Sequence, residues 1–265
     1  MDIRISENTM QQKRIVCWFS CGAASAVATK LAIEENARGA NLPLVVARIA
    51  VKNESEDNDR FAADCERWFG VPILSLMNEK YGSSVDTVIE KERYLVGPHG
   101  AACTRLLKKA VRMAFQFPGD RQVFGYTSEE QDRVDNFIDA NADIDLWPIL
   151  VEKSLMKADC LAMVERAGIN LPAMYLMGYR NNNCIGCVKG GAGYWNKIRV
   201  DFPSVFAQRA KQERLLNRTI CKIGGERVFL DELPVDAGNY PNEPEIQCGI
   251  FCEMAEKEMS RDIAA

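Results

Sequence analysis

Short apolar runs alternate with longer amphipathic stretches along the first two thirds of the chain. The runs have the length of buried strands, and the stretches repeat apolar positions at helical spacing. Strands separated in this way by helices are typical of a parallel sheet covered on both faces, so we expect a doubly wound α/β fold. The pattern predicts strands over 13–19, 44–50, 72–76, 121–126 and 144–147, and helices over 24–37, 57–69, 84–93, 104–116, 129–140 and 155–167.

The pattern changes after residue 170. Segment 181–194 holds three Asn, two Cys and four Gly, which predicts neither helix nor strand. Segment 201–218 predicts one helix with Pro203 near its start, and the tail repeats a helical pattern. We therefore expect an α/β domain over 1–180 and a cysteine-bearing C-terminal extension over 181–265 that packs on the same domain.

The first predicted strand leads into a helix through a turn of small residues. Its sequence, Ser20-Cys21-Gly22-Ala23-Ala24-Ser25, leaves the N–H groups at the helix start with little side-chain bulk above them. Such a turn suits a phosphate or sulfate, and ligands of doubly wound sheets bind at the carboxyl ends of the strands. An ordinary tight connection between strand and helix is the alternative.

Charge and hydropathy limit the class of protein. The 265 residues carry 33 basic and 37 acidic side chains, a net charge of −4, so the whole chain has no electrostatic footprint for nucleic acid. A local patch near Lys108, Lys109 and 189–199 stays open. No apolar stretch reaches the roughly 20 residues of a membrane span, and the polar N-terminus lacks a signal peptide, so we expect a cytoplasmic protein without membrane contact.

Ten cysteines are many for a protein of a reducing compartment, where they indicate metal binding or thiol chemistry before disulfides. Four stand singly among apolar residues and are interpreted as small buried side chains: Cys17, Cys65, Cys160 and Cys221. Five others are the candidates for metal binding or thiol chemistry: Cys103, the pair Cys184 and Cys187 in a CxxC, and Cys248 and Cys252 in the tail. A CxxC suits structural zinc, here completed by the two tail cysteines, a redox pair or an iron–sulfur site.

The turn resembles two known phosphate loops. It is similar to the SGGxDS loop of the adenine-nucleotide alpha-hydrolase superfamily through Ser20, Gly22 and Ser25, with Cys21 and Ala24 as departures. It also resembles the SxGAxxAV version of the phosphoadenosine phosphosulfate (PAPS) reductase family. That version matches here through Gly22, Ala23, Ala26 and Val27.

Three further segments extend the resemblance to the PAPS reductase family over most of 13–252. Asn53 and Glu54 precede a helix and a VPI strand, as in the family's second-strand segment. GYTSEEQDR is similar to GxRxxQSxxR through Gly125, Gln131 and Arg133, and LPAMYLMGYRNNNCIGC is similar to LPxxxLYxxGYxxxGCxxC. The resemblance implies a set of residues at the nucleotide phosphates: Ser20, Cys21, Gly22, Ala23, Ala24, Ser25, Asn53, Glu54, Lys108, Gly125 and Arg133.

The resemblance also implies a 4Fe-4S cluster. Cys103-Thr104 stands where the family's cluster-bearing reductases carry a CC dipeptide, before Lys108-Lys109 in place of an RK pair. The implied ligands are Cys103, Cys184, Cys187 and either Cys248 or Cys252, or three cysteines with an open iron. The glycines of 190–193 are expected to offer N–H groups to the cluster or to an anion.

The implied activity is reduction of an adenylyl sulfate, in which Cys248, from a tail similar to ECGxH, is the nucleophile and a thioredoxin-like thiol donor releases sulfite. Thr127 stands where the family's reductases carry an Arg, so one cationic contact to the sulfate is missing. The alternative is an ATP-dependent, Mg²⁺-assisted, pyrophosphate-releasing sulfurtransferase that acts on tRNA, DNA or a small molecule. A non-catalytic nucleotide- or zinc-binding protein is the third reading, and a homo-oligomer stays open.

Overall fold

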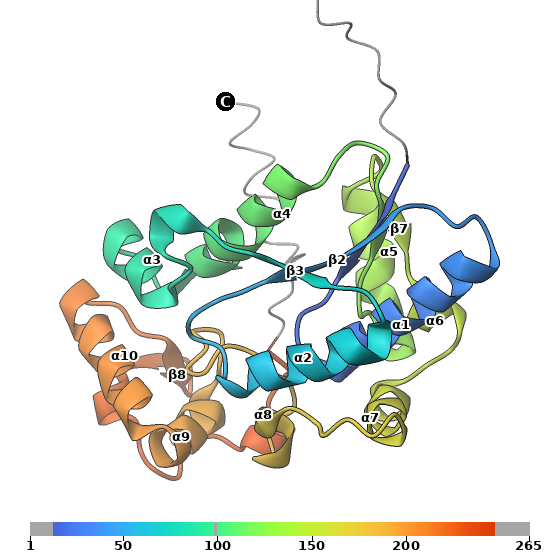
Figure 1. Cartoon of the computed structure of the whole chain (residues 1–265). Helices are drawn as coiled ribbons and strands as arrows, with labels where there is room; N and C mark the ends of the chain where they lie inside the picture. Colours follow the sequence, from blue (N-terminus) through green and yellow to red (C-terminus); the bar gives the residue numbers. More distant parts are fainter. Residues whose placement is uncertain (1–12, 98–99, 247–265) are drawn as a thin grey trace, which may run out of the picture.

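The computed structural model describes residues 13–97 and 100–246. A five-stranded sheet forms its centre, all its strands are parallel, and their order is β3-β2-β1-β6-β7 (Figure 1). The strands are β1 (Ile15–Trp18), β2 (Leu44–Ile49), β3 (Ile73–Leu76), β6 (Arg121–Val123) and β7 (Asp145–Trp147). The chain proceeds outward from β1 to β3 and then, from β6, in the opposite direction, which confirms the predicted doubly wound parallel fold.

Side chains of β1 alternate between two apolar layers, as expected for a strand buried on both faces. Ile15 and Cys17 contact one layer, and Val16 and Trp18 contact the other. The helices of the first layer are α1 (Ala23–Arg38), α2 (Asp57–Phe69) and α7 (Lys157–Arg166). The helices of the second layer are α4 (Ala110–Phe115) and α5 (Gln131–Ala140).

The connection from β3 to β6 is long and carries its own elements. These are the 3-10 turn Glu79–Tyr81, α3 (Val85–Glu92), the short antiparallel pair β4 (Val96–Gly97) and β5 (Gly100–Ala101), and a π-helical segment, Thr104–Lys109. The π-helical segment continues directly into α4, so the predicted helix over 104–116 is present but starts with wider turns. Such turns inside a helix often occur at functional sites.

The C-terminal third is more regular than its composition predicts. Residues 192–194 were expected to be irregular, yet they begin a helix. Besides α7, the elements after β7 are α6 (Ile149–Glu152), α8 (Ala173–Leu176), α9 (Ala192–Asp201), α10 (Pro203–Leu216), the hairpin of β8 (Cys221–Ile223) and β9 (Glu226–Val228), and 3-10 turns at Leu230–Glu232 and Tyr240–Asn242. Pro203 is the first residue of α10, as predicted. Figure 1 shows α9 and α10 in orange, with α10 next to α3, where Gln212 bonds to Asp86.

The extension contacts the α/β part through a shared apolar cluster. Cys184 and Val188 pack in it with Val88 and Ile89 of α3 and with Leu107 of the π-helical segment. A second cluster, formed mainly within the extension, includes Tyr194, Trp195, Ile198, Leu230 and Leu233. The cysteine turn is therefore packed on elements that follow β3.

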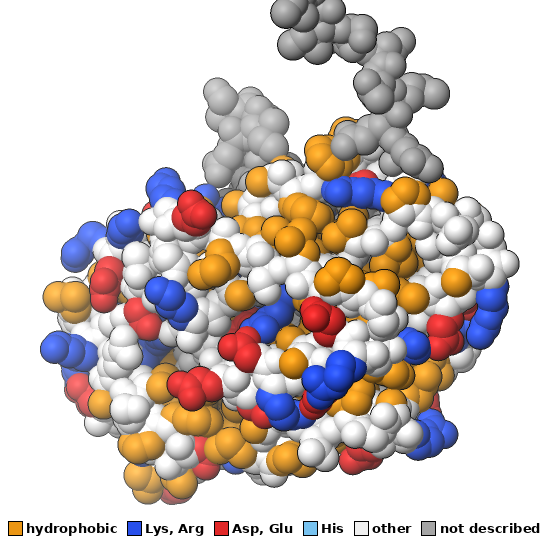
Figure 2. Space-filling view, viewed as in Figure 1, with side chains coloured by type: hydrophobic (Ala, Val, Ile, Leu, Met, Phe, Trp, Pro, Cys, Tyr) orange, Lys and Arg blue, Asp and Glu red, His pale blue; other side chains and the backbone are white. Residues whose placement is uncertain are grey.

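The surface carries charges of both signs. On the face shown in Figure 2, basic and acidic side chains are interspersed, and that face has no broad patch of a single sign. Among the helices of the described residues, none is both long enough and apolar enough to cross a bilayer.

Candidate functional site

The candidate site lies at the carboxyl end of β1, where the strand order reverses. β1 pairs with β2 on one side and with β6 on the other, and the helices that follow β1 and β6 cover opposite faces of the sheet. In doubly wound sheets this arrangement opens a crevice between the loops that leave the two central strands. The loop after β1 is the small-residue turn.

Hydrogen bonds within the turn fix its shape. The Ser25 hydroxyl donates to the Gly22 carbonyl at 2.9 Å and accepts from the Ser20 N–H at 3.1 Å, with the Ser20 hydroxyl also at 3.1 Å. Gly22 precedes α1 with an extended backbone and no side-chain cap, and the first bond within the helix runs from the Ala26 N–H to the Gly22 carbonyl. The N–H groups of Ala24 and Ser25 thus have no acceptor inside the helix, as at any helix start.

Gly125, in the loop after β6, contacts the backbone of this turn. A Cβ built on Gly125 would lie 2.5 Å from the Ser25 nitrogen and 2.8 Å from the Ala24 carbonyl carbon. Backbone atoms cannot move aside as the end of a side chain can, so only glycine fits here. The sequence placed Gly125 at the site, and its close approach to Ala24 and Ser25 agrees with that placement.

Tyr175 of α8 reaches the same turn, which the sequence did not indicate. Its hydroxyl lies 3.3 Å from the position of a Cβ on Gly22, and the backbone groups of Ala23 and Asn182 hydrogen-bond to it. Burial raises the pKa of the Tyr175 phenol to about 12, although these two hydrogen bonds act in the opposite direction. The phenol is therefore neutral at pH 7, and its O–H is a donor beside the start of α1.

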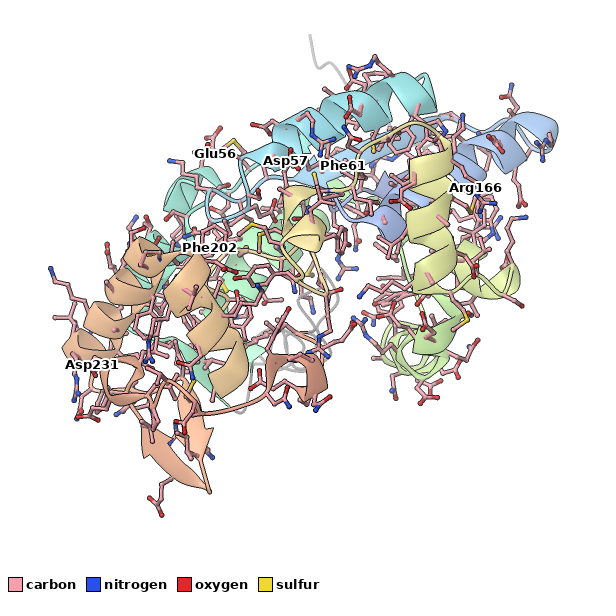
Figure 3. All side chains as sticks on the ribbon, turned by 90° about the horizontal axis from the view of Figure 1, so that it is seen from below. Glu56, Asp57, Phe61, Arg166, Phe202 and Asp231 are labelled. Carbon is pink, nitrogen blue, oxygen red and sulfur yellow. The ribbon has the colours of Figure 1, made fainter. Side chains whose placement is uncertain are left out.

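The start of α2 anchors α8. The carboxylate of Asp57 accepts from the Ala173 N–H at 2.8 Å, and Arg60 binds the same carboxylate as well as the carbonyls of Asn170 and Leu171. Figure 3 shows Asp57 where α2 meets α8. The hydrogen bond from Arg60 lowers the pKa of Asp57. This anchor sets the position from which Tyr175 reaches the turn.

Asn182 connects the turn to the cysteine segment. Its Nδ2 donates to the Cys21 carbonyl at 2.6 Å and to Oδ1 of Asn58 at 2.7 Å. Asn182 is buried, and so are Cys21 and Asn58. Cys21 has a positive φ of 56°, a conformation that costs about 1–2 kcal/mol for a residue other than glycine. The bond from Asn182 stabilises that strained residue of the turn.

A buried carboxylate and two cations surround this contact. Nδ2 of Asn58 donates to Glu54 at 3.2 Å, and Lys108 Nζ lies 3.3 Å from the other oxygen of Glu54. Burial raises the pKa of Glu54, while Lys108 and Arg48 oppose the shift. Glu54 and Lys108, both predicted at the site, are therefore next to each other, and Asn58 connects Glu54 to Cys21 of the turn.

Cys21 is a packing residue in this arrangement. Its side chain is fully buried, with Sγ 3.8 Å from the Asn58 carbonyl. Burial raises the pKa of the Cys21 thiol to about 12. A thiol with this pKa is neutral at pH 7 and is a poor nucleophile.

Asn53 and Arg133 have partners away from the turn. The Asn53 amide accepts from the Val85 N–H and donates to Asp86, both at 2.8 Å, so it holds the start of α3. The backbone carbonyl of Asn53 accepts from the Ile185 N–H at 2.7 Å, and this bond connects the loop after β2 to the CxxC. Arg133 forms an ion pair with Glu130 and lies over the Tyr126 ring at 5.0 Å. That both touch a nucleotide remains a prediction.

Thr127 has a structural role. Its hydroxyl and its N–H both pair with the side chain of Glu130, which closes a capping box at the 3-10 turn Ser128–Glu130 before α5. Thr127 is buried. Thr127 thus serves helix capping.

Tyr194 of α9 closes the CxxC turn. Its hydroxyl accepts from the Cys187 N–H at 2.9 Å and donates to the Cys184 carbonyl at 3.4 Å. Cys184 and Cys187 are both buried. The sequence identified the two cysteines but not the tyrosine that bridges them.

The N–H groups at the start of α9 bind a carboxylate of the protein itself. Glu243 accepts from Gly193 at 2.6 Å and from Tyr194 at 3.0 Å. The glycines of 190–193 were expected to serve a cluster or an external anion. Instead, a Cβ on Gly190 would overlap the Tyr194 ring and one on Gly191 would overlap Glu243, so at these positions they permit internal packing.

The cysteines suit a soft metal in their chemistry. Cys184 belongs to the same apolar cluster as the half-buried Cys103, whereas Cys187 packs in the neighbouring one. Within residues 13–97 and 100–246, no three His, Cys, Asp or Glu side chains form a group that could hold a metal ion. Cys248 and Cys252, the predicted nucleophile and fourth ligand, lie outside the described residues. The donor set fits a thiolate-bound group only if residues beyond the described ones complete it.

Comparisons with known proteins give no match: no family model matches the chain, and no curated protein matches it.

Proposed function

We propose that this protein binds an adenine nucleotide at the turn Ser20–Ser25 and uses it in sulfur chemistry at the neighbouring cysteines. The observation that carries the proposal is the bond from Asn182 to the Cys21 carbonyl, because it joins the phosphate turn to the segment that leads into Cys184 and Cys187. The bond from the Ile185 N–H to the Asn53 carbonyl also supports the proposal, because it connects the CxxC to the loop after β2.

The phosphate side of the proposal rests on the start of α1. The N–H groups of Ala24 and Ser25 and the positive end of the helix dipole favour an anion there. The ordered turn and the tight fit of Gly125 form this geometry without a ligand, so binding does not need to order the loop. Lys108 adds positive charge beside Glu54.

The leading reaction is reduction of an adenylyl sulfate. A Cys248 thiolate attacks the sulfur, the bond from sulfur to the phosphate oxygen breaks, and AMP leaves. A thioredoxin-like thiol then attacks Cys248, forms a mixed disulfide and releases sulfite, and its second thiol resolves the disulfide. This thiol cycle suits a reducing compartment such as the cytoplasm.

A 4Fe-4S cluster is the group that we propose for the cysteines. Its ligands would be Cys103, Cys184, Cys187 and one of Cys248 and Cys252, and when bound it would supply electron-transfer or sulfur-binding chemistry next to the nucleotide. The burial of Cys184 and Cys187 favours such a group, because solvent exclusion protects a cluster.

The alternative reaction is ATP-dependent sulfur transfer to tRNA, DNA or a small molecule. The capping role of Thr127 favours it, since no arginine stands there to bind a sulfate or a second phosphate. ATP would bind with Mg²⁺ and adenylylate the acceptor oxygen, pyrophosphate would leave, and sulfur would then displace AMP.

Two assays on the full chain, purified without oxygen, separate these reactions. Sulfite release from adenylyl sulfate with thioredoxin supports the reductase, and exchange of labelled pyrophosphate into ATP supports the transferase. Nucleotide binding without either turnover would overturn the enzymatic proposal. Iron and sulfide content of about four each per chain is expected for the cluster, whereas about one zinc and no sulfide would contradict it.

A further inference from the structure

The hydroxyl of Tyr194 joins the two ends of the CxxC turn. It accepts from the Cys187 N–H at 2.9 Å and donates to the Cys184 carbonyl at 3.4 Å. Because one atom bonds to the backbone of both cysteines, it holds the two backbone positions together. A phenylalanine would keep the ring but lose both bonds.

Packing fixes the Tyr194 ring itself. The ring contacts Tyr179, Trp195 and Tyr240, with centroids between 5.7 and 6.1 Å away. Only 3% of Tyr194 is exposed, and a side chain at Gly190 would overlap the ring. The hydroxyl therefore cannot swing away from the cysteines while α9 keeps its place.

The backbone of Tyr194 is bound by the segment that leads into the tail. Glu243 accepts from the N–H groups of Gly193 and Tyr194 and so caps α9. Three further contacts hold the same segment: Arg180 to the Pro244 carbonyl at 3.2 Å, Lys157 to Glu245 at 2.9 Å, and Asn183 to the Ile246 carbonyl at 3.1 Å. Tyr194 thus bonds to the tail segment at its backbone and to the CxxC at its side chain.

We propose that Tyr194 is a positioning residue for the Cys184–Cys187 pair, and that it makes the geometry of the pair depend on the docking of residues 240–246. The proposal rests on the proposed function only in treating the pair as the sulfur- or metal-binding element. When Glu243 leaves α9, the start of the helix loosens, the Tyr194 hydroxyl moves, and the two thiols no longer hold one geometry. The tail segment that precedes Cys248 thereby controls the thiol pair.

Metal affinity measures this directly. We would titrate the reduced, metal-free full chain with Cd²⁺ alone, without oxygen, and follow the ultraviolet absorption of the cadmium–thiolate bonds. Removing a group that orients metal ligands costs about 10–100-fold in affinity, so Tyr194→Phe should bind Cd²⁺ that much more weakly. Glu243→Gln should weaken binding in the same direction by a smaller factor.

Tyr179→Phe is the matched control. Tyr179 lies in the same aromatic cluster, but its hydroxyl bonds to Asp201 at 2.8 Å and not to the cysteine turn. Equal Cd²⁺ affinity in the Tyr194→Phe variant and the unmodified chain would overturn the proposal, as would a chain that binds no Cd²⁺ or a Tyr179→Phe variant that loses as much. Far-UV circular dichroism of each variant identifies misfolding, and in that case the effect of Glu243→Gln decides.

The same preparations separate this proposal from the proposed function. The unmodified chain could turn over neither adenylyl sulfate nor ATP, while Tyr194→Phe still weakens Cd²⁺ binding. That result would keep the positioning role of Tyr194 and remove the enzymatic proposal. Nucleotide turnover by the unmodified chain, together with equal Cd²⁺ affinity in Tyr194→Phe, would keep the enzymatic proposal and remove the positioning role.

Discussion

Asn182 donates to the carbonyl of Cys21 at 2.6 Å although 161 positions separate the two residues in the chain. The bond joins the turn Ser20–Ser25, which follows the first strand, to a residue two positions before the CxxC. Both amide hydrogens of Asn182 are used, because the second one goes to Asn58. A side chain placed in this way links two sites that the sequence presents as separate motifs.

Asn182→Ala should destabilise the protein by about 1–3 kcal/mol, because the Cys21 carbonyl and Asn58 would lose their buried donor. We also expect weaker nucleotide binding, since Cys21 would lose the bond that stabilises its positive φ. Urea unfolding and calorimetric titration with nucleotide measure the two effects. The neighbouring variant Asn183→Ala is the control, because that side chain donates to the Ile246 carbonyl and, among the described residues, makes no bond to the turn. Equal losses of nucleotide affinity in both variants would contradict the role assigned to Asn182.

Gly125→Ala should be more harmful to nucleotide binding than Gly22→Ala. The new methyl group on Gly125 would meet backbone atoms of Ser25 and Ala24 at 2.5 and 2.8 Å, and overpacking of this kind costs about 1–3 kcal/mol. A methyl group on Gly22 would have the Tyr175 hydroxyl as its nearest atom, at 3.3 Å. The φ of Gly22 is −105°, which any residue can adopt. We expect at least about a tenfold loss of affinity for Gly125→Ala, which corresponds to 1.4 kcal/mol. The reverse order in a nucleotide titration would contradict this picture of the turn.

Glu54→Gln should flatten the dependence of stability on pH. Burial raises the pKa of Glu54 above the ordinary carboxyl value of about 4.3, so the folded state holds this proton more tightly than the unfolded state does. The stability from this group is therefore complete below pH ~4.3 and is lost as the pH rises through the folded pKa. Melting temperatures of the unmodified chain and of Glu54→Gln, measured between pH 4.5 and 8, give the difference in pH dependence. Parallel curves for the two proteins would refute the raised pKa of Glu54.

Cys21 should resist alkylation in the folded protein. With its pKa raised to about 12 by burial, only about one thiol in 10⁴ is ionised at pH 8. Mass spectrometry after iodoacetamide treatment should find Cys21 unmodified in the folded chain and modified after denaturation. Rapid labelling of the folded chain would mean that the turn opens or that Cys21 is a nucleophile.

The sheet was predictable because each strand is a short apolar run between helices, as in Ile15–Trp18. Helix α9 was not, because its start is rich in glycine and its cap, Glu243, lies about 50 positions further along the chain. The helix predicted over 104–116 was found, but no local signal marked the π-helical start of that segment.

The motifs brought Ser20–Ser25 and Gly125 together in one predicted site, and the structure places Gly125 against the backbone of Ala24 and Ser25, where only glycine fits. That the turn binds phosphate remains a prediction. Asn182 and Tyr194 were not predicted as site residues. Each acts through a contact with a distant segment, and three consecutive Asn residues give no sign of which one is buried. The partner of Asn53, Asp86, was missed for the same reason, whereas Arg133 pairs locally with Glu130.

The contact between Asn182 and Cys21 also has a consequence for the order of folding. During synthesis the first strand, the phosphate turn and α1 leave the ribosome long before Asn182 exists. Until then, Cys21 must hold its left-handed backbone without that donor, and closing a loop of 161 residues carries an entropic cost that local structure does not. The nascent chain can therefore build its sheet early, but the turn Ser20–Ser25 gains its contact with Asn182 only when the C-terminal third has docked. Truncation before residue 181 should leave a folded sheet in which this turn lacks that contact.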